Sequence, residues 1–365
     1  KDRRKEMENL RLFIPGPVTV RDEVLAKMAA PQIGHRTKDA SALQRRISDN
    51  LRKLWNTKEE ILLSTTSGSG LMEGAIRSCT AKKAAVFSIG AFGTRWYEMG
   101  KWNAVEADLF ETEMGRATDP DEVDRALASG KYDLVTITHN ETSSGVMNPI
   151  EEIAAVVRKY PETVFCVDMV SSAGGYRVDV DRLGIDICIT SSQKCLGLPA
   201  GLAACTFSRK AVERARTVQN RGFYLDLLQL YDFIQKKDYQ YPSTPSLAHM
   251  FALDYQLDYI INEEGLENRF ARHEEMMEMV REWAGRNFAL LAEDDIASRT
   301  VTTVVNTRNI DISELNRELK KRGMMISNGY GELKDKTFRI AHMADTTPAQ
   351  ITELLDNLDD ILGLN

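Results

Sequence analysis

Residues 164–201 constrain the fold of this chain more than any other stretch. Two apolar runs, 164–167 and 185–189, have the pattern of strands, and each run is followed by polar residues. Strands that are buried on both faces of a parallel sheet have such continuous apolar sequences, and their carboxyl ends gather ligand-binding groups at one edge. The first run ends at Asp168, and the second is followed closely by Lys194. The sequence therefore predicts a carboxylate and an amine at neighbouring strand ends.

Apolar strand-like runs alternate with helical patterns between residues 60 and 207, which predicts a doubly wound α/β domain with a mostly parallel sheet. Further strands are expected at 61–64, 84–89, 134–138 and 202–207. Helices are expected at 21–28, 40–54, 71–78, 94–102 and 150–159. Because crossovers of this kind are right-handed, the helices should cover the faces of the sheet.

The regular alternation of strand-like and helical patterns ends after about residue 246. Long helical patterns come first, and a mixed tail follows them. The expected helices are 246–264, 268–287, 312–321 and one that begins at Pro348, and the expected strands are 301–305 and 338–341. We therefore predict a large domain at 18–250 and a smaller α+β domain formed by 1–17 and 251–365.

The N-terminal end of the chain precedes the first clear helix. Residues before Leu12 are expected to form a frayed or helical lead-in. Residues 13–17 include Pro15 and Pro17, and each proline fixes its own φ and favours an extended conformation of the residue before it. We expect a stiff, extended segment, whose simplest role is that of a connector.

The composition is that of a globular protein and argues against some classes of function. Hydrophobic residues make up 43% of the 365 residues and charged residues 28%, and the net charge is −7. This charge, with no basic stripe interleaved with aromatic residues, argues against nucleic-acid binding. The start of the chain lacks the apolar core of a secretory signal, and no run has the length of a membrane span. We therefore expect a soluble, cytoplasmic protein that binds no membrane.

The cysteines predict neither a metal site nor a disulfide framework. The five cysteines are Cys79, Cys166, Cys188, Cys195 and Cys205. Their number is odd, they lack metal-ligand spacing, and four of them lie in or beside apolar runs. Small buried thiols in a reducing compartment are the expected state.

A glycine-rich turn at 65–70 joins a predicted strand to a helix that begins near Leu71. Backbone N–H groups and hydroxyls in such a turn, with the helix dipole behind them, suit a phosphate. The spacing of Gly68, Gly70 and Gly74 differs from that of the dinucleotide-binding motif, and no Gly-Lys-Ser/Thr sequence follows. A dinucleotide fold and a nucleoside triphosphatase are therefore not favoured, and a merely flexible turn is the alternative.

Two more strand ends present groups that suit a ligand. Phe92 follows the strand at 84–89 between two glycines, where it could stack on a planar ring or simply pack in the core. The segment 138–145 closes another strand with hydrogen-bonding side chains, which could reach a ligand or only cap the loop, and His139 by itself signals little.

Asp168 and Lys194 together suit pyridoxal phosphate, whose chemistry needs an amine to form an imine and an acid to keep the ring nitrogen protonated. An unpaired carboxylate at the end of a buried run is costly, and a protonated pyridine nitrogen would satisfy Asp168. Burial and a nearby cation would lower the pKa of Lys194 and favour the neutral amine. Capping of a helix by Asp168 is the alternative.

Arg339 lies inside the predicted strand 338–341, where a guanidinium needs a partner. A bidentate contact with a substrate α-carboxylate would explain it, and a structural ion pair is the alternative.

With these residues in place, the chain resembles the class V pyridoxal-phosphate aminotransferases of fold type I, and among them the alanine–glyoxylate and serine–glyoxylate (serine–pyruvate) aminotransferases. The matching segments run nearly from end to end of the chain. They are Pro-Gly-Pro at 15–17, Ser-Gly-Ser-Gly at 67–70, Thr-His-Asn-Glu-Thr-Ser-Ser-Gly at 138–145, Asp-Met-Val-Ser-Ser-Ala-Gly-Gly at 168–175, Ser-Gln-Lys at 192–194 and Phe-Arg-Ile at 338–340.

The resemblance implies a role for each matching residue. Lys194 would form the Schiff base, and Asp168 would pair with the pyridine nitrogen. The other implied contacts are Ser69, Gly70 and Gln193 with the phosphate, Phe92 with the ring face, Ser143 with the polar edge of the cofactor, Tyr241 and Thr244 with the phosphate of the neighbouring subunit, and Arg339 with the substrate carboxylate. The resemblance also implies an obligate homodimer with shared sites and a ping-pong transfer from alanine or serine to glyoxylate or pyruvate.

The pair His35-Arg36 departs from the glyoxylate branch. Phosphoserine transaminases have a His-Arg pair at a similar place, where it meets the substrate phosphate. His35 and Arg36, together with His342, are therefore candidate ligands for a second anionic group, and a phosphoserine transaminase that uses 2-oxoglutarate is the alternative function. An ion pair or a contact within the entry loop would also explain the pair.

Other classes of function are less well supported by the sequence. A class V cysteine desulfurase needs a mobile cysteine on a long loop, whereas the cysteines of this chain lie in or beside predicted core elements. A lyase or a kynureninase-like hydrolase of the same fold remains possible. A non-enzymatic binding protein would be expected to lack Lys194 or Asp168, and both are present.

Overall fold

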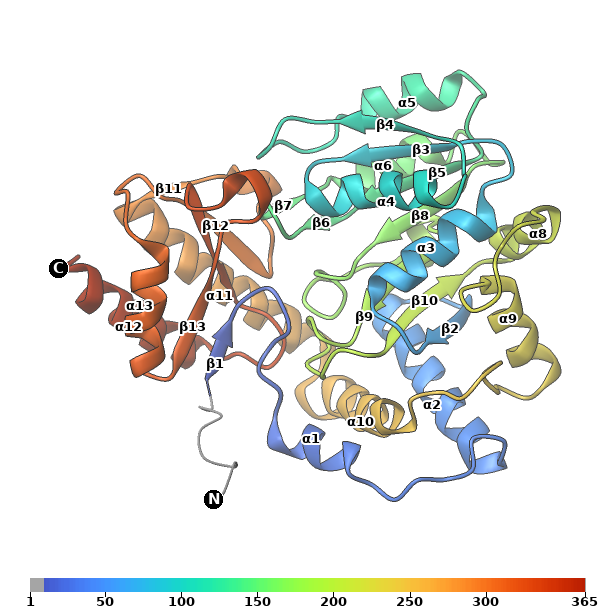
Figure 1. Cartoon of the computed structure of the whole chain (residues 1–365), viewed down its shortest axis with the longest axis horizontal. Coiled ribbons are helices and arrows are strands. Elements are labelled where there is room, and N and C mark those ends of the chain that lie inside the picture. Colours follow the sequence, from blue (N-terminus) through green and yellow to red (C-terminus); the bar gives the residue numbers. More distant parts are fainter. Residues whose placement is uncertain (1–9, 365) are drawn as a thin grey trace.

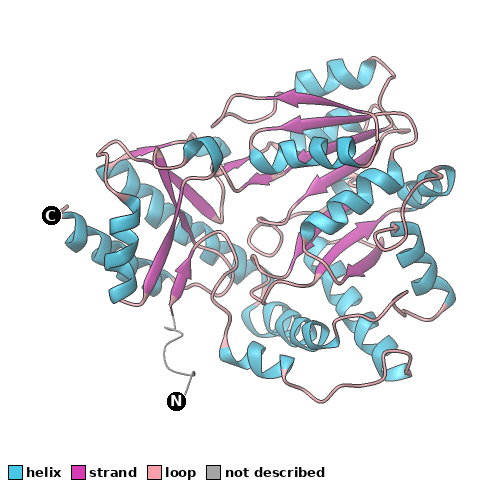
Figure 2. Ribbon diagram, in the orientation of Figure 1, coloured by secondary structure: helices cyan, strands magenta, loops and turns pink. Residues whose placement is uncertain are grey.

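The large β-sheet forms the centre of the molecule (Figures 1 and 2) in the computed structural model, which describes residues 10–364. Its strands, in spatial order, are β2 (Glu60–Ser64), β10 (Ala203–Phe207), β9 (Ile187–Ser191), β8 (Val164–Asp168), β5 (Leu134–Thr138), β3 (Ala84–Ser88) and β4 (Ala107–Glu111). The run from β9 to β4 is parallel, and β10 pairs antiparallel with both β9 and β2. The prediction of a mostly parallel sheet is therefore confirmed.

Helices cover both faces of this sheet, as a doubly wound fold requires. The sequence alternates accordingly within the strands: Phe165 and Val167 of β8 pack in the core on one face, and Val164 and Cys166 pack in the core on the other. The helices on the first face are α1 (Asp22–Met28), α2 (Lys38–Trp55), α5 (Pro120–Ala128), α6 (Ile150–Val157), α7 (Val180–Leu183) and α10 (Leu247–Asp258). Those on the second face are α3 (Gly68–Cys79), α4 (Ala91–Trp102), α8 (Arg209–Thr217) and α9 (Leu227–Lys236).

A second, smaller sheet lies beside the large one and is built mainly from the C-terminal part of the chain (Figure 1). Its strands, in spatial order, are β1 (Arg11–Phe13), β13 (Met324–Asn328), β14 (Thr337–Ala341), β12 (Val301–Val305) and β11 (Ala289–Leu290). Helices α11 (Leu266–Asn287), α12 (Ile312–Lys321) and α13 (Pro348–Leu362) pack against it in a separate apolar core. The first strand of the chain, β1, pairs parallel with β13.

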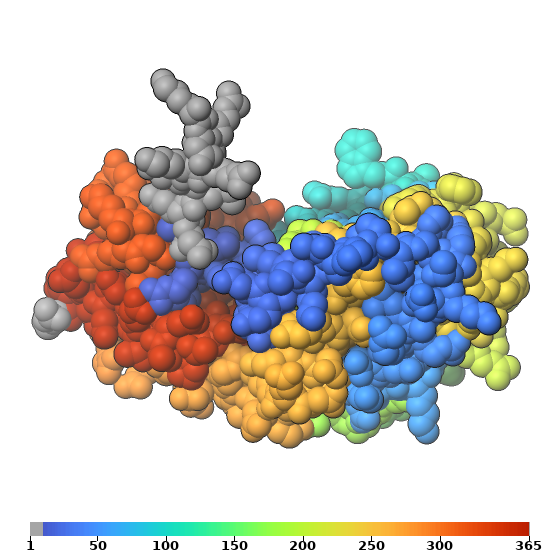
Figure 3. All heavy atoms as spheres, turned by 90° about the horizontal axis from the view of Figure 1, so that it is seen from below, coloured from blue at the N-terminus to red at the C-terminus, as the bar shows by residue number. Residues whose placement is uncertain are grey.

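The N-terminal segment connects the two parts of the molecule. From β1 the chain turns past the large sheet and enters α1, which packs against α10. Figure 3 shows this segment, in blue, running along the surface from the red C-terminal part past the gold residues near 250. A short π-helix, Tyr259–Glu264, then leads from α10 into α11.

Local sequence explains where several helices begin and end. The Thr37 hydroxyl accepts a hydrogen bond from the N–H of Ala40 at the start of α2, and Asp311 caps α12 in the same way. Helix α13 has a capping box formed by Thr347 and Gln350 and ends at Gly363, whose φ of 63° is costly for other residues.

Several elements differ from the sequence prediction. The predicted stiff segment at 13–17 is a turn instead, because Gly16 has a φ of +93° and donates its N–H to the carbonyl of Ile14 at 2.7 Å. Arg11 belongs to a strand rather than to a lead-in, and residues 1–9 lie outside the described part of the chain. The unpredicted elements are β1, β4, α5, β6 (Asn140–Glu141), β7 (Val146–Met147), α7, α8, α9, β11, β13 and the 3₁₀ turns Asp294–Ile296 and Gly331–Leu333.

The state of the cysteines agrees with the prediction, because all five thiols are free and buried. Within residues 10–364, no helix combines the length and the apolar character that crossing a membrane requires. The division of the chain into domains at residues 17/18 and 250/251 stays a prediction.

Candidate active site

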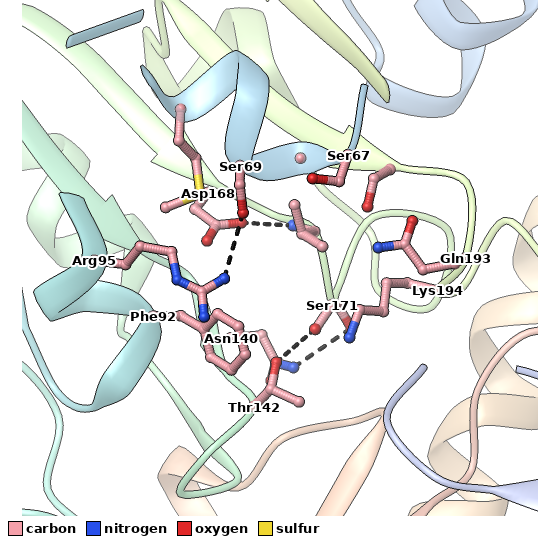
Figure 4. Close-up of a pocket in the computed structure, with 14 residues that line it drawn as sticks. Ser67, Ser69, Phe92, Arg95, Asn140, Thr142, Asp168, Ser171, Gln193 and Lys194 are labelled. Carbon is pink, nitrogen blue, oxygen red and sulfur yellow. Dashed lines mark hydrogen bonds between the residues drawn. The ribbon is translucent and has the colours of Figure 1, made fainter. Parts of the chain in front are cut away.

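A cavity of about 190 Å³ lies at the carboxyl ends of the parallel strands (Figure 4). The predicted residues Asp168 and Lys194 both face it, from the ends of the neighbouring strands β8 and β9. The lining residues are Ser67, Gly68, Ser69, Met72, Phe92, Arg95, Asn140, Thr142, Asp168, Val170, Ser171, Ser191, Gln193 and Lys194. The structure thus brings together segments that are far apart in the sequence.

Lys194 is held in a nearly dry environment. Lys194 is only 9% exposed, and its Nζ donates a hydrogen bond to the carbonyl oxygen of Pro15. Burial lowers the pKa of this lysine to about 8, and the positive charges of Arg339 and Arg95 act in the same direction while Asp168 opposes them. The amine is therefore partly neutral near physiological pH, as a nucleophile must be.

Asp168 shows the opposite shift for the same reason. Burial raises the pKa of its carboxyl group to about 6, although the N–H of Val170 stabilises the charged form through a hydrogen bond of 2.8 Å to Oδ1. Among the described residues, this is the one hydrogen bond that the carboxylate accepts. A cationic partner placed in the cavity would satisfy the rest of its capacity.

The start of helix α3 faces the same cavity with unused donors. Ser67 precedes the helix and its hydroxyl does not cap it, and the first N–H groups of a helix have no partner within it. Gly68 is required here by packing, because a Cβ at this position would lie 2.5 Å from Cγ2 of Val170. This end of the cavity suits an anion such as a phosphate.

Gly70, which we expected beside the phosphate, does not line the cavity. Its N–H donates to the carbonyl of Ser67 at 3.0 Å, so this group is already used within the turn. A Cβ at Gly70 would lie 2.6 Å from Oγ1 of Thr66. Close packing within the turn, rather than contact with a ligand, therefore explains this glycine, while Ser69 does reach the cavity.

Phe92 lines the cavity from the first turn of α4, and an unpredicted carboxylate fixes its backbone. Oε2 of the fully buried Glu141 accepts hydrogen bonds from the N–H groups of Phe92 at 3.0 Å and Gly93 at 3.1 Å. A negative charge at a helix N-terminus is favourable. Glu141 therefore positions the aromatic ring without touching the cavity itself.

Ser143, which we expected at the polar edge of the cofactor, supports helix α4 in the structure. Its hydroxyl donates to Oε1 of Glu141 at 2.6 Å and accepts from the N–H of Ala91 at 3.2 Å, so it belongs to the support of α4 and does not line the cavity. The preceding residue, Thr142, lines the cavity in its place, and its Oγ1 hydrogen-bonds to Oγ of Ser171 at 2.6 Å.

Two arginines bring positive charge to the site. Arg339 of β14 is buried, and its hydrogen bonds go to backbone carbonyls, from Nε to Asn328 at 3.0 Å and from Nη1 to Thr142 at 3.1 Å. Burial lowers the pKa of this guanidinium to about 10, and no salt bridge joins it to a carboxylate in the described part of the chain. The unpredicted Arg95 lines the cavity, and its guanidinium lies over the ring of Phe92 at 4.6 Å.

Arg339 itself does not line the cavity but binds the carbonyl of the lining residue Thr142, and the other predicted residues do not line it within the single chain either. Arg36 donates to the backbone carbonyls of residues 241–243, and His35 precedes it in the same loop. The hydroxyl of Tyr241 accepts from the N–H of Thr65 at 3.1 Å, and Thr244 is exposed. His342 is fully buried beside Thr302, and burial lowers its pKa to about 3.

The residues that line the cavity fit pyridoxal phosphate. Among the buried side-chain oxygens of the described residues that have no hydrogen-bond partner, three belong to lining residues: Asn140 Oδ1, Ser191 Oγ and Gln193 Oε1. The start of α3, Asp168 and Phe92 all line the cavity, which thus offers groups for a phosphate, a pyridinium nitrogen and a ring face. Orphaned polar atoms of this kind indicate a ligand, because buried polar groups are normally paired.

Comparison with known proteins agrees with this fit. The family model described as aminotransferase class-V matches residues 20–341. An uncharacterized aminotransferase of Methanocaldococcus jannaschii is 41% identical over 342 residues, which cover 91% of this chain and 87% of that protein. The serine–glyoxylate aminotransferase of Arabidopsis thaliana is 29% identical over 363 residues, with coverage of 96% and 90%.

The fold points to the same group of enzymes. The crystal structure of an alanine–glyoxylate aminotransferase from Nostoc sp. superimposes with a TM-score of 0.92 at 26% identity, covering 99% of this chain and 97% of that chain. The expected fold type I architecture is therefore confirmed. The chain belongs to the class V aminotransferase family and is a pyridoxal-phosphate-dependent aminotransferase.

Proposed function

We propose that this enzyme transfers an amino group from a small amino acid, alanine or serine, to a small 2-oxo acid, glyoxylate or pyruvate. The observation that supports this most directly is Arg339, a buried guanidinium with only carbonyl partners beside a cavity of about 190 Å³. A guanidinium can bind a carboxylate through two parallel hydrogen bonds, and every amino acid and 2-oxo acid carries one. The names of the Arabidopsis and Nostoc relatives support the small substrates.

The residues of this chain divide the work of the reaction. Bound pyridoxal phosphate supplies an electron sink that stabilises negative charge at the substrate Cα. Asp168 holds the proton on the pyridine nitrogen, while the N–H groups at the start of α3, with Ser69 and Gln193, bind the phosphate. Phe92 lies against the ring, and Thr142 takes the place that we first expected for Ser143.

Lys194 has two successive roles in this proposal. Its Nζ would hold the bound cofactor covalently, and a partly neutral amine with a pKa of about 8 suits this attachment near neutral pH. With an amino donor in the site, the freed amine would remove the proton from the substrate Cα and return a proton later. Arg339 orients the substrate carboxylate so that the Cα–H bond faces this amine.

We also propose that two chains form a homodimer with shared sites. Tyr241 and Thr244 do not line the cavity of their own chain, and the neighbouring Phe223 is 80% exposed. If a second chain covered this face, Tyr241 and Thr244 of the first chain would lie at the phosphate site of the second chain. Sedimentation of the purified protein at the mass of one chain would contradict this part of the proposal.

The alternative functions receive less support from the site. A phosphoserine transaminase would use His35, Arg36 and His342 for the substrate phosphate, but Arg36 is bound to backbone carbonyls and His342 is buried. A cysteine desulfurase would need a mobile thiol, and all five thiols are buried.

The proposal is tested first by attachment of the cofactor. The purified protein should be yellow, and borohydride should fix the cofactor to Lys194, as peptide mass spectrometry would show. Lys194→Ala should abolish this attachment, while Lys210→Ala, which removes the lysine paired with Asp186 at 2.8 Å, should retain it. A wild-type protein that stays colourless with added pyridoxal phosphate would refute the assignment.

The substrate pair is tested by steady-state rates with alanine or serine plus glyoxylate or pyruvate. A parallel assay uses phosphoserine plus 2-oxoglutarate. We expect turnover in the first assay, and turnover in the second alone would favour the phosphoserine alternative.

A further inference from the structure

Arg269, near the start of α11, joins the two loops that follow Asp168 and Lys194. Its side chain has an exposed fraction of 0%. Its Nε donates to the carbonyl oxygen of Gly174 at 3.0 Å, and its Nη2 donates to the carbonyl oxygen of Cys195 at 2.6 Å. Gly174 lies in the loop that follows Asp168, and Cys195 is the residue after Lys194. A single guanidinium therefore bridges the two segments from which the acid and the amine enter the cavity.

The loops are also in direct contact at this point. A Cβ at Gly175 would lie 3.0 Å from Sγ of Cys195 and 2.6 Å from Cγ2 of Thr300, so no larger side chain fits without a shift. The Sγ of Cys195 in turn lies 3.5 Å from the carbonyl oxygen of Ser171. Close packing of this kind transmits a displacement of one loop to the other.

Two carboxylates balance the buried charge. The Nη1 of Arg269 donates to Oε2 of Glu264 at 2.5 Å and to Oδ1 of Asp345 at 3.0 Å. Burial alone would lower the pKa of Arg269, but these carboxylates raise it above its ordinary value. Asp345 also accepts from Nε2 of Gln256 at 2.8 Å and from Nε of Arg21 at 3.2 Å. Four hydrogen bonds thus engage all three nitrogens of the guanidinium, and two carboxylates balance its charge, as a buried cation requires.

We propose that Arg269 is a positioning residue, which fixes the separation of Asp168 and Lys194 by holding the backbone carbonyls of the two loops that carry them. The guanidinium suits this role because its donors form a rigid, planar fork, so that two acceptors bound to one side chain keep a fixed relation. The inference rests on the roles proposed above for Asp168 and Lys194. Its contribution would be geometric, since a misplacement of about 1 Å can cost about 100-fold in rate.

The test uses Arg269→Lys in the full-length protein. Lysine keeps the positive charge beside Glu264 and Asp345 but cannot hold both carbonyls. We expect the dissociation constant of pyridoxal phosphate to rise about tenfold, as the loss of one charged hydrogen bond of about 1.5 kcal/mol implies. We expect kcat to fall about 100-fold.

A second readout does not depend on the cofactor. Competitive acetylation of Lys194 in the cofactor-free protein, followed by mass spectrometry over a range of pH, reports the environment of the amine. The titratable and charged groups that act on the amine are all retained in Arg269→Lys; they are Cys195, Asp168, Arg339 and Arg95. A loosened loop admits water, so we expect the acetylation profile of Lys194 to move towards higher pH.

The matched control is Arg272→Lys, one turn further along α11. Arg272 also binds Glu264, from Nη2 at 2.5 Å, but its carbonyl partners are Ala344 and Thr346 rather than the two loops. We expect this variant to lose thermal stability while it keeps the wild-type cofactor affinity and the wild-type profile of Lys194.

Two results would overturn the positioning role. One is a folded Arg269→Lys protein with wild-type cofactor affinity and an unchanged acetylation profile of Lys194. The other is an Arg272→Lys protein whose cofactor affinity and Lys194 profile change as much as those of Arg269→Lys. If Arg269→Lys does not fold, the test uses Asp345→Asn, which removes one of the two charges that balance Arg269. We expect the acetylation profile of Lys194 to move towards higher pH by a smaller amount than in Arg269→Lys. An unchanged profile in Asp345→Asn would contradict the positioning role. Failure of the wild type to attach the cofactor at Lys194 would instead refute the proposed function.

Discussion

At the scale of single residues, burial acts on Asp168 and Lys194 in opposite directions. It raises the pKa of the carboxyl group to about 6 and lowers that of the amine to about 8. The two values lie close enough that both groups change protonation within about one unit of neutral pH. The same desolvation therefore prepares the acid to accept a cationic partner and the amine to act as a nucleophile.

Arg339 offers a test of substrate binding that leaves the cofactor alone. Arg339→Lys keeps the charge but loses the planar fork, so we expect KM for the amino donor and for the 2-oxo acid to rise about 10- to 100-fold, as the loss of 1.5 to 3 kcal/mol implies. The absorbance of the bound cofactor should stay that of the wild type. Steady-state kinetics measure the KM values, and an absorption spectrum of the variant measures the state of the bound cofactor.

A suitable control is Arg281→Lys, at a partly buried arginine whose partners are Asp294 and the carbonyl of Ala292. This pair lies in the smaller part of the molecule, away from the residues that line the cavity. We expect unchanged KM values. An equal rise of KM in both variants would mean that Arg339 acts through stability rather than through the substrate carboxylate.

The sequence alone places some residues at the site and misses others for a physical reason. Asp168, Lys194, Ser69, Phe92 and Gln193 stand at the ends of strands with clear apolar patterns, and all five line the cavity. The sequence does not predict Arg95, which lies in α4, and it names Asn140 and Thr142 only as members of the polar segment 138–145. The direction of a side chain at these places depends on hydrogen bonds that no periodicity predicts. The exchange of Thr142 for Ser143 is a one-residue error of this kind.

At the scale of elements, the turn between β1 and α1 is as close to the reactive lysine as any part of the large sheet. A Cβ at Gly16 would lie 2.7 Å from Cδ of Lys194 and 2.9 Å from the carbonyl oxygen of Gln193. The amide of Val18 also donates to the carbonyl oxygen of Gln193 at 3.3 Å. The N-terminal turn therefore forms part of the wall around Lys194.

Gly16→Ala tests this contact. The added methyl group must displace Lys194 or the turn, so we expect the dissociation constant of pyridoxal phosphate to rise at least about tenfold, with a stability loss of about 1 to 3 kcal/mol from the strained φ. Equilibrium binding and thermal unfolding measure the two effects separately.

Gly130→Ala is the matched control for the strain. Gly130 also has a positive φ, of +69°, but nothing lies within 4 Å of a Cβ built there. The control should lose stability and keep its affinity for the cofactor. A Gly16→Ala protein that loses no more cofactor affinity than Gly130→Ala would contradict the close contact.

The elements differ in how much of them could be predicted. Helices with strong apolar periodicity and caps, such as α12, were predicted with the observed bounds, Ile312–Lys321. The strands β4 and β13 were missed, since β4 lies at the edge of its sheet with every residue at least partly exposed and so lacks a continuous apolar run. Strand β1 is only three residues long, and its partner β13 is more than 300 residues further along the sequence. No local sequence pattern therefore predicts this strand.

At the scale of the whole molecule, buried histidines make stability depend on pH. Burial lowers the pKa of His139 to about 4 and that of His342 to about 3, below the ordinary value of 6.5, so both are neutral in the folded protein. Below about pH 6.5 the unfolded chain takes up protons that the folded chain does not. Stability should therefore fall as the pH drops towards 4, by up to about 1.4 kcal/mol per pH unit for each histidine.

His342→Gln removes one of these groups. We expect a shallower loss of unfolding free energy between pH 6 and pH 4 than in the wild type, measured by urea denaturation at each pH. The matched control is Thr302→Val, in which the His342 imidazole stays buried but loses the hydrogen bond that joins its Nε2 to Oγ1 of Thr302 at 3.0 Å. That variant should be less stable at every pH with an unchanged slope, and an unchanged slope in His342→Gln would contradict the assignment.

The pairing of β1 with β13 also has a consequence for the order of events during synthesis. Residues 11–13 are made more than 300 residues before their partners at 324–326. Until then the turn that carries Pro15 and Gly16 has no sheet to hold it against Lys194. The large sheet of a nascent chain can thus be complete while its lysine is still open to water, and the pocket closes only after residues 324–326 have been made.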